Sequence, residues 1–283
     1  MGIRIRKIGF FILLSSAFSA CDKFEMRGFF LSYESADERF GQSMEWNSAR
    51  PFREITVPVD SYTLFAAADI HVGGTHNLDI LLDDAIGADV TAVIMVGDLT
   101  SGHAEDFLTF QQHLPDQDTL VTFQIPGNHD YYFDGWKQFY AIFGSATYLF
   151  TVRTPEATDL FICLDTGSGT LGSDQLEWLK HVLETERPNH RRCVVFTHNN
   201  LFRIRHTAST NPVVEELYVL ADLCVRHEID MVVTGHDHVK NEVALGNTRH
   251  ITMDALLDDY KDAGYFRMWV EQGVIGYEFV ELR

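Results

Sequence analysis

The sequence predicts an α/β fold with its polar residues gathered at one edge of a sheet. Five short apolar runs have the length and the composition of buried strands. Several of them are separated by segments with helical periodicity, which is typical of βαβ units. Each run is followed directly by a cluster of polar residues. The runs are Leu64–Ala68, Ala92–Val96, Leu120–Ile125, Cys193–Thr197 and Met231–Thr234.

The N-terminal half alternates helices and strands along the chain. We expect Lys23–Asp60 to be a tether that leads into the fold. Within it, Ser35-Ala-Asp-Glu38 has the spacing of a capping box, which predicts a short helix from about Ala36 to Met44, and a solvated linker is the alternative. Two further helices are expected between the first three strands, near Asn77–Ile86 and Ala104–His113.

The C-terminal half adds antiparallel strands. Thr147–Val152 and Asp159–Leu164 surround a short turn and predict a hairpin. Ser173 is suited to cap a helix over Asp174–Glu186, and another helix is predicted near Val213–His227. Four short strands are expected in the tail: Glu242–Leu245, His250–Met253, Gly264–Val270 and Val274–Val280.

The five polar clusters predict one binuclear metal site. Open α/β sheets place their ligands just outside the carboxyl ends of the strands, so we expect the clusters to converge. Carboxylates, imidazoles and an amide oxygen suit Zn, Mn, Fe, Co or Ni ions, and the missing thiolates argue against a structural zinc site. The clusters are Asp69-Ile-His71, Gly97-Asp98, Gly127-Asn128-His129-Asp130, His198 and Gly235-His236-Asp237-His238.

A site of this kind predicts hydrolysis of a phosphate ester. Two metal ions about 3.5–4 Å apart can clamp the attacking and the leaving oxygen of an in-line displacement. They also lower the pKa of a shared water enough to supply hydroxide near neutral pH. Any one cluster taken alone is more often an exposed loop. The ordered set of five clusters, each after a strand-like run, favours the metal site.

The clusters resemble the pattern of the calcineurin-like metallophosphoesterase superfamily, which is D-x-H, G-D, G-N-H-D or E, a lone His, and G-H-x-H. The resemblance runs from about Thr63 to Gly246. It implies a four-layer αββα sandwich, in which two mixed β-sheets pack face to face with helices outside. It also implies two divalent or trivalent metal ions as cofactors, which could be Mn, Fe, Zn, Co or Ni.

The resemblance assigns a role to each residue of the site. The first metal would be held by Asp69, His71 and His238, and the second by Asn128, His198 and His236. Asp98 would bridge the two metals. His129 would not be a ligand, and it would stabilise the transition state or protonate the leaving oxygen.

Two positions depart from branches of the superfamily. In the phosphoprotein phosphatase branch an acid lies three residues after the bridging Asp and supports the catalytic His, whereas Ser101 stands here. In the purple acid phosphatase branch a Tyr lies at that position. Neither branch is therefore favoured, and the sequence leaves open which group orients His129.

The first two dozen residues predict export. Arg4, Arg6 and Lys7 precede the apolar stretch Ile8–Phe18, which is too short to span a membrane as a helix. Small residues directly before Cys21 resemble a bacterial lipoprotein cleavage box. We therefore expect a signal peptide over residues 1–20, lipidation of Cys21 and a tethered segment over residues 21–60. Ordinary cleavage and an uncleaved anchor are the alternatives.

The predicted anchor places the catalytic domain, residues 61–283, at the cell envelope. It would face the periplasm or the cell surface. The formal charge is −19, and residues 1–20 contribute +3 with no acids, so residues 21–283 carry −22. Such an acidic surface repels a nucleic acid backbone, and no nucleic acid partner is expected.

The remaining cysteines and histidines have ordinary structural interpretations. Cys163, Cys193 and Cys224 lie in apolar runs, where buried thiols are favoured and disulfides stay possible. The histidines outside the five clusters are expected at the surface. They are His76, His103, His113, His181, His190, His227 and His250.

Two groups of residues are candidates for substrate binding. Arg203, Arg205 and His206 lie in the loop Asn199–Pro212 and could hold a substrate phosphate, and a solvated basic loop is the alternative. Tyr131 belongs to an aromatic group that could form a wall for the leaving group or could lie in the core. The other members of that group are Tyr132, Phe133 and Trp136.

The leading functional hypothesis is a membrane-tethered phosphoesterase acting on a phosphorylated small molecule or a lipid head group. A phosphodiesterase or pyrophosphatase acting on nucleotides or lipid head groups is the alternative within the enzyme class. A non-catalytic envelope lipoprotein that keeps the metal cradle is the alternative from another class. The presence of His129 favours an enzyme.

Overall fold

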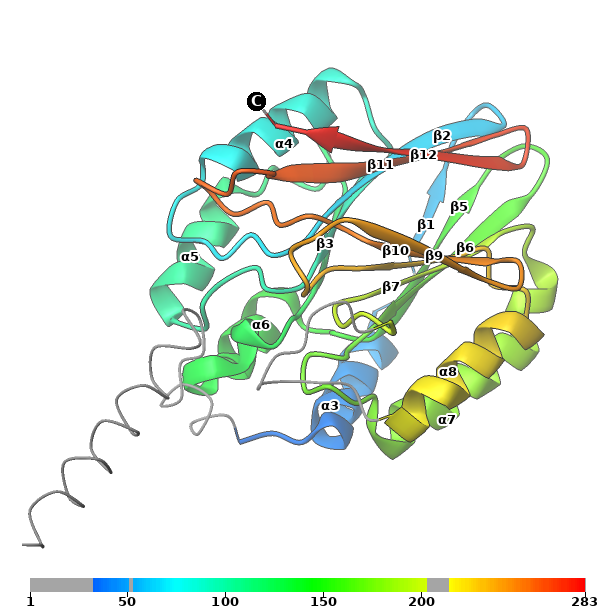
Figure 1. Cartoon of the computed structure of the whole chain (residues 1–283), viewed down its shortest axis with the longest axis horizontal. Coiled ribbons are helices and arrows are strands. Elements are labelled where there is room, and N and C mark those ends of the chain that lie inside the picture. The colour runs from blue at the N-terminus through cyan, green and yellow to red at the C-terminus, as the bar shows by residue number, and fades with distance from the viewer. Residues whose placement is uncertain (1–32, 51–52, 203–213, 283) are drawn as a thin grey trace, which may run out of the picture.

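The smaller of two β-sheets carries the first three predicted strands. The computed structural model describes residues 33–50, 53–202 and 214–282, and Figure 1 shows their arrangement. This sheet has the order β12-β11-β2-β3-β4. Its β2, β3 and β4 are parallel, and β11 is antiparallel to both of its neighbours. The strands are β2 (Ser61–Ala67), β3 (Ala92–Val96), β4 (Thr122–Ile125), β11 (Gly264–Glu271) and β12 (Val274–Glu281).

The larger sheet has seven strands in the order β1-β5-β6-β7-β8-β10-β9. It is also mixed, because β5 with β6 and β9 with β10 are antiparallel whereas the other neighbours are parallel. The strands are β1 (Arg53–Thr56), β5 (Tyr148–Arg153), β6 (Thr158–Leu164), β7 (Cys193–Thr197), β8 (Met231–Thr234), β9 (Asn241–Leu245) and β10 (Thr248–Thr252).

Helices cover the outer face of each sheet (Figure 1). Helices α4, α5 and α6 lie on the smaller sheet, and α7 and α8 on the larger. The helices are α3 (Ala36–Ser48), α4 (His76–Gly87), α5 (Ala104–His113), α6 (Trp136–Phe143), α7 (Gly172–Thr185) and α8 (Val214–Arg226). Two short 3-10 helices are η1 (His129–Asp134) and η2 (Arg187–Asn189).

Alternating side chains of the central strands separate three hydrophobic clusters. On β2, Leu64 and Ala66 face the other sheet, whereas Phe65 and Ala67 face the helices. On β7, Val194 belongs to the cluster between the sheets, and Val195 to the cluster beneath α7 and α8. Both sheets are therefore buried on two faces. This confirms the predicted four-layer sandwich.

The predicted tether contributes to the fold. Ser35 and Glu38 form the predicted capping box, and α3 runs four residues past the predicted end at Met44. Strand β1 was not predicted, and it pairs in parallel with β5. Residues 36–50 and 53–60 are thus integrated into the domain, and the solvated-linker alternative for this segment is wrong.

The structure differs from the sequence-based predictions at three further points. Helix α6 was not predicted, although its Trp136 and Phe139 are buried. Ser173 does not cap α7, because the helix begins at Gly172, two residues before the predicted start, and its N-cap is Leu171. His250 is buried rather than exposed, at 5% relative accessibility, and its ring contacts that of Phe202.

The three cysteines that the structure describes are free and buried, which agrees with the favoured interpretation as buried thiols. Cys21 lies outside the described residues. Among the helices that are described, none combines the length and the apolar character that a membrane crossing requires.

Candidate metal centre

Within each sheet, backbone hydrogen bonds join the loops that follow neighbouring strands. The amide of Asp69 donates to Gly97 O (3.0 Å), and that of His71 donates to Asp98 O (2.9 Å). The amide of Gly235 donates to His198 O (3.0 Å). The polar clusters are thereby fixed at one end of the sandwich, as predicted from the direction of the strands.

Most candidate ligands have a left-handed backbone. Such a conformation is uncommon for residues with a Cβ, although Asp and His tolerate it better than most. Several such residues in one place indicate a functional site, since each costs on the order of 1–3 kcal/mol. The positive φ angles are 55° at Asp69, 45° at His71, 50° at Asp98, 72° at His236 and 56° at His238.

Glycines in the motifs let the ligand loops approach one another. A Cβ on Gly97 would lie 2.4 Å from Nδ1 of His198, and one on Gly127 would lie 2.3 Å from the amide nitrogen of Asp98. These contacts are too short for carbon. The motif glycines are therefore required by packing at the site as well as by turn geometry.

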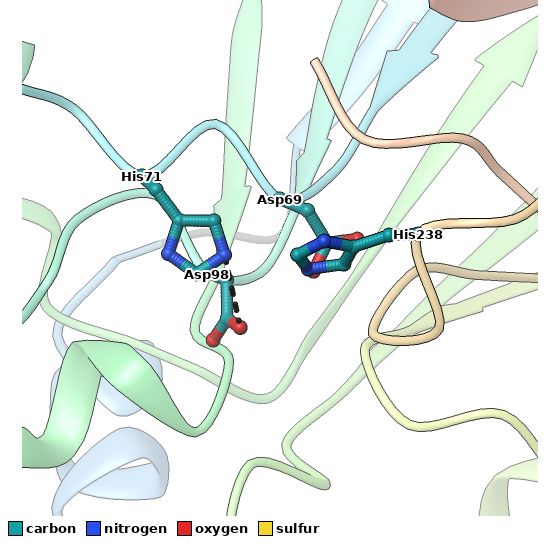
Figure 2. Close-up of side chains that lie close together, drawn as sticks. All are labelled: Asp69, His71, Asp98 and His238. Atoms are coloured by element: carbon teal, nitrogen blue, oxygen red, sulfur yellow. Dashed lines mark ion pairs between the residues drawn. The ribbon is translucent and has the colours of Figure 1, made fainter. Parts of the chain in front are cut away.

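A first cluster consists of Asp69, His71, Asp98 and His238, all buried, with one ligand atom of each lying within 4.8 Å of the others. Figure 2 shows the imidazole of His71 directed toward Asp98 and that of His238 beside Asp69. Nε2 of His238 lies 3.1 Å from Oδ1 of Asp69. The four side chains come from loops of both sheets.

A second cluster consists of Asp98, His198 and His236, and it shares Asp98 with the first. Oδ2 of Asp98 lies 3.6 Å from Nε2 of His71 and 3.4 Å from Nε2 of His198. One carboxylate oxygen thus faces an imidazole from each cluster. This is the geometry that a bridging ligand requires.

Several buried polar atoms of the site have no hydrogen-bond partner and are available as metal ligands. Among the described residues, Nε2 of His71, Oδ1 of Asn128 and Nε2 of His198 are buried without a hydrogen-bond partner. Unpaired buried polar atoms are costly unless something binds them. Imidazole nitrogens with carboxylate and amide oxygens form a donor set for borderline metal ions. The residues present therefore fit two such ions.

Hydrogen bonds around the clusters orient the ligands. Nδ1 of His198 contacts Val96 O at 3.0 Å, which leaves Nε2 directed at Asp98. The amide of His236 donates to Oδ2 of Asp69 (2.8 Å). The amide of His129 donates to Oδ1 of Asp98 (2.8 Å). Each carboxylate thus has one oxygen bound to an amide and the other directed into the site.

The pKa values of three groups in the clusters are strongly shifted. Burial lowers the pKa of His71 to about 3. Burial alone would also lower the pKa of His198, but the carboxylates of Asp98 and Asp69 outweigh it and raise that pKa to about 10. Burial opposes ionisation of Asp69, but His238 outweighs it and lowers the pKa of Asp69 to about 2. Concentrated charge of this kind is typical of functional sites.

His129 lies beside the two clusters and is more accessible than their members. Its side chain is 15% exposed, compared with 2% for Asp98. Its Nε2 lies 4.0 Å from Oδ2 of Asp98. The ring packs between those of His71 and Tyr132, each with its centroid 4.7 Å away. Burial lowers the pKa of His129. Packing against these rings, together with the hydrogen bond from its backbone amide to Asp98, holds His129 in place.

Asp130 is a structural residue of the site whose role was not predicted from the sequence. Its buried carboxylate accepts hydrogen bonds from the amides of Leu99 (3.1 Å), Thr100 (2.8 Å) and Gly127 (2.8 Å). It therefore ties the Asp98 loop to the Asn128 loop. The D-or-E position of the G-N-H-D motif was the available signal.

Asp237 and Arg39 complete the support of the loops. Oδ2 of Asp237 accepts from Nδ2 of Asn200 (2.8 Å), which joins the H-D-H loop to the loop after His198. Arg39 on α3 is buried, donates to Oδ2 of Asp165 (2.8 Å), and lies over the Tyr131 ring at 4.0 Å. Asp237 stood inside a recognised motif, whereas nothing local to Arg39 indicated its role.

The candidate substrate residues do not gather at the centre. Tyr131 is buried in the hydrophobic cluster beneath α4 to α6 and packs on Arg39 and Trp136, which favours its core alternative over a substrate wall. Arg203, Arg205 and His206 lie outside the described residues. The structure brings six of the seven candidate ligands together in two clusters, with His129 beside Asp98, and Asn128 directly precedes His129 in the chain.

An α/β sandwich with two carboxylate and imidazole clusters that share one Asp is an arrangement suited to a binuclear metal centre. The chain belongs to the calcineurin-like phosphoesterase family, whose model matches residues 62–240. Among the curated proteins there is no match.

Three solved structures share the fold at low sequence identity. GAP50, the anchor in the inner membrane complex of Plasmodium, has a TM-score of 0.64 and 14% identity over 78% of this chain and 84% of its own. A dimetal phosphatase from Danio rerio has a TM-score of 0.59 and 14% identity over 80% and 97%. A putative 5′-nucleotidase from Staphylococcus aureus, in complex with alpha-ketoglutarate, has a TM-score of 0.52 and 15% identity over 78% and 53%.

Proposed function

We propose that this protein is an exported, membrane-tethered phosphoesterase that depends on two metal ions. The observation that carries the proposal is the pair of ligand clusters that share Asp98, with the accessible His129 beside them. Asp69, His71 and His238 would hold one ion, and Asn128, His198 and His236 the other, with Asp98 between the ions. Mn, Fe, Zn, Co and Ni are the ions that suit these donors.

Each of the chain's own groups has a part in this reaction. The two ions, when bound, would polarise the phosphoryl group and lower the pKa of a water so that it becomes a nucleophile at neutral pH. His129 is not a member of either cluster, and its partly exposed ring can donate a proton to the leaving oxygen. The hydrogen bonds that backbone amides donate to Asp69 and Asp98 keep the carboxylates oriented while charge develops in the reaction.

The proposed substrate is a phosphorylated small molecule or a lipid head group. The formal charge of −19 opposes binding of a polyanion such as nucleic acid, so we propose no nucleic acid partner. The basic start, the apolar Ile8–Phe18 stretch and Cys21 support export and a lipid anchor at the cell envelope. The alternative within this class is a phosphodiesterase or pyrophosphatase.

A non-catalytic metal-binding lipoprotein is the second candidate function. It is favoured by the likeness of the fold to GAP50, which is described as an anchor. The two candidates differ in the need for His129, because a protein that only binds metal has no use for a proton donor beside the ligands.

A phosphatase assay of the mature protein with matched variants tests the proposal. Chromogenic phosphate mono- and diesters are offered with each of the five metals, and relative rates decide between a monoesterase and a diesterase. We expect His129→Ala to retain metal and lose about 10²- to 10⁴-fold in turnover, which is the usual contribution of general acid catalysis. Asp98→Asn should lose metal and activity together. His181→Ala, an exposed histidine on α7, is the control and should match wild type.

The outcomes distinguish the candidates. No hydrolysis with any metal, together with bound metal, would favour the non-catalytic candidate. Full activity of His129→Ala would refute the assigned role of His129. The anchor is tested separately by fractionation, because a Cys21→Ser variant should be released from the membrane, and one that stays bound after processing would contradict lipidation.

A further inference from the structure

A pocket of about 530 Å³ lies where the edges of the two sheets come together. Thr122, Phe123 and Gln124 of the edge strand β4 form one side, and Arg53 of the edge strand β1 contributes to the other. The C-terminal end of α3, the end of α6 and the start of β5 close the pocket. None of the seven candidate metal ligands lines it. Its volume falls in the range of small-molecule sites.

Aromatic rings form much of the pocket wall. Phe123 stacks on Phe150 at 4.0 Å with an interplanar angle of 12°, and Phe150 stacks on Phe161 at 4.7 Å and 8°. Phe123 also stacks against Tyr148 (6.0 Å, 28°), so the pocket wall continues the ring stack of the core between the sheets. Trp46 and Tyr148 add further rings. A flat, rigid wall of this kind favours a planar guest over a flexible chain.

Two arginines of the pocket have no ion-pair partner among the described residues. Eleven of the fourteen Lys and Arg side chains in the described part of the chain lie within 4.0 Å of a carboxylate oxygen. Arg50, Arg53 and Lys261 are the other three. Two of the three thus stand at one pocket of a strongly acidic protein.

Both guanidinium groups are positioned by neutral partners. Arg50 lies over the Trp46 ring at 3.3 Å from its centroid. Arg53 donates from Nη1 to Oε1 of Gln117 (2.7 Å) and lies 5.6 Å from the centroid of the Phe123 ring. Asp118 acts on Arg53 from beyond ion-pair distance. The remaining donors of both arginines are free to bind an anion.

We propose that this pocket binds a small organic anion with a planar aromatic body, which lies along the pocket wall and whose charge is held by Arg50 and Arg53. The proposal is independent of the phosphoesterase activity, because the pocket shares no residue with the metal clusters. Carboxylate, sulfonate and phosphate are all groups that guanidinium binds well. The planar body distinguishes this ligand from a fatty acid or lysolipid, which carries the same charge on a flexible chain.

Calorimetric titration of the full mature chain with three probes tests the proposal. The probes are 2-naphthalenesulfonate, which is planar and anionic, neutral 2-naphthalenemethanol, and octanesulfonate, which is anionic and flexible. We expect saturable one-to-one binding of 2-naphthalenesulfonate, and binding at least about tenfold weaker for the other two. Loss of a charge-assisted hydrogen bond accounts for about that factor in the neutral probe.

Variants locate the binding. Arg50→Gln and Arg53→Gln should each weaken 2-naphthalenesulfonate about fivefold to tenfold, and both side chains reach solvent, so the variants should fold. Arg249→Gln, an exposed arginine on β10, is the matched control and should bind as wild type. Asp98→Asn should also bind as wild type, because the metal centre is not involved.

Four results with the probes and the arginine variants would overturn the proposal. They are an absence of saturable binding at millimolar probe, equal affinity for the neutral probe, tighter binding of octanesulfonate, and unchanged affinity in the variant that lacks both Arg50 and Arg53. Loss of binding in Asp98→Asn would place the anion at the metal centre and would overturn it as well.

Discussion

At the scale of single residues, Asp98 makes three kinds of contact through its backbone and its side chain. Its backbone carbonyl accepts from the His71 amide, its Oδ1 accepts from the His129 amide, and its Oδ2 faces both ligand clusters. Its φ of 50° is the conformation that permits all three. A substitution beside Asp98 should therefore disturb the whole centre even when the new side chain is apolar and small.

Gly127→Ala is such a substitution, and we expect it to reduce bound metal. The new Cβ would lie 2.3 Å from both the amide nitrogen and Oδ1 of Asp98. The Asp98 loop must move, at a cost of about 1–3 kcal/mol in stability. Metal analysis after dialysis measures the loss of bound metal, and urea unfolding measures the loss of stability.

Gly41→Ala is the matched control for this prediction. Gly41 lies within α3 and has no heavy atom within 4 Å of a built Cβ. Ala should stabilise the helix there by roughly 0.5–1 kcal/mol and leave metal content unchanged. Equal metal content in the two variants would refute the packing argument for Gly127.

His250 leads to a second residue-scale prediction, which concerns pH. Burial lowers the pKa of His250 from 6.5 to about 4, and neither ring nitrogen has a hydrogen-bond partner among the described residues. Between pH 6.5 and 4 the unfolded chain therefore binds a proton that the folded protein does not. Stability should be fully present above pH 6.5 and should fall as the pH decreases toward 4.

The size of this effect follows from the pKa values. At pH 5 the loss amounts to at most about 2 kcal/mol relative to pH 7. A His250→Leu variant lacks the titrating group, so its unfolding free energy should decrease less between pH 7 and pH 5 than that of wild type. Urea unfolding at both pH values measures the difference, and identical decreases would contradict the prediction.

At the scale of elements, local patterns predicted most helices and strands, and the failures have non-local causes. Strand β3, helix α5 and strand β8 lie where the sequence placed them. Helix α7 starts earlier than predicted because acids distant in sequence satisfy its first amides. Glu216 of α8 accepts from the Leu171 amide, and Asp37 of α3 accepts from the Asp174 amide.

Strand β1 and helix α6 were missed for the same reason. Strand β1 has four residues and alternates between half-buried and exposed positions, and its pairing partner β5 is almost one hundred residues away. Helix α6 is a short aromatic segment, and only its packing on the smaller sheet distinguishes it from a loop. Local sequence carries little of this information.

Helix α3 is connected to the site loops through one buried ion pair, and Arg39→Met should be strongly destabilising. Methionine keeps much of the volume but leaves the Asp165 carboxylate buried and unpaired, since both side chains are 2% exposed. Removal of one partner of a buried pair typically costs about 3–5 kcal/mol. The measurement is the free energy of unfolding in urea.

A second Arg and carboxylate pair serves as the control. Arg153 and Glu54 are 2.6 Å apart but 54% and 36% exposed, so Arg153→Met should destabilise the protein far less than Arg39→Met. Similar costs for Arg39→Met and Arg153→Met would show that α3 does not depend on the buried pair.

At the scale of the whole molecule, the metal centre lies on the seam between the two sheets. Asp69, Asp98 and Asn128 follow strands of the smaller sheet, whereas His198, His236 and His238 follow strands of the larger. The order of these residues in the sequence was sufficient to predict that they converge. It did not predict the residues that brace the loops, such as Asp130 and Asp165, because their partners are identified only by the folded geometry.

Metal ions bound at this seam would link the two sheets, so their removal should destabilise the entire domain. A ligand bound only by the folded state stabilises it by about 4 kcal/mol at a thousand times its dissociation constant. For a domain of this size that corresponds to roughly 8–16 °C in melting temperature. We expect EDTA to lower the melting temperature of wild type by about this amount and added Mn or Zn to restore it. EDTA should not change the melting temperature of Asp98→Asn. It should lower the melting temperature of His181→Ala as much as that of wild type. If EDTA strips the metal from wild type and its melting temperature stays the same, the ions do not hold the sheets together.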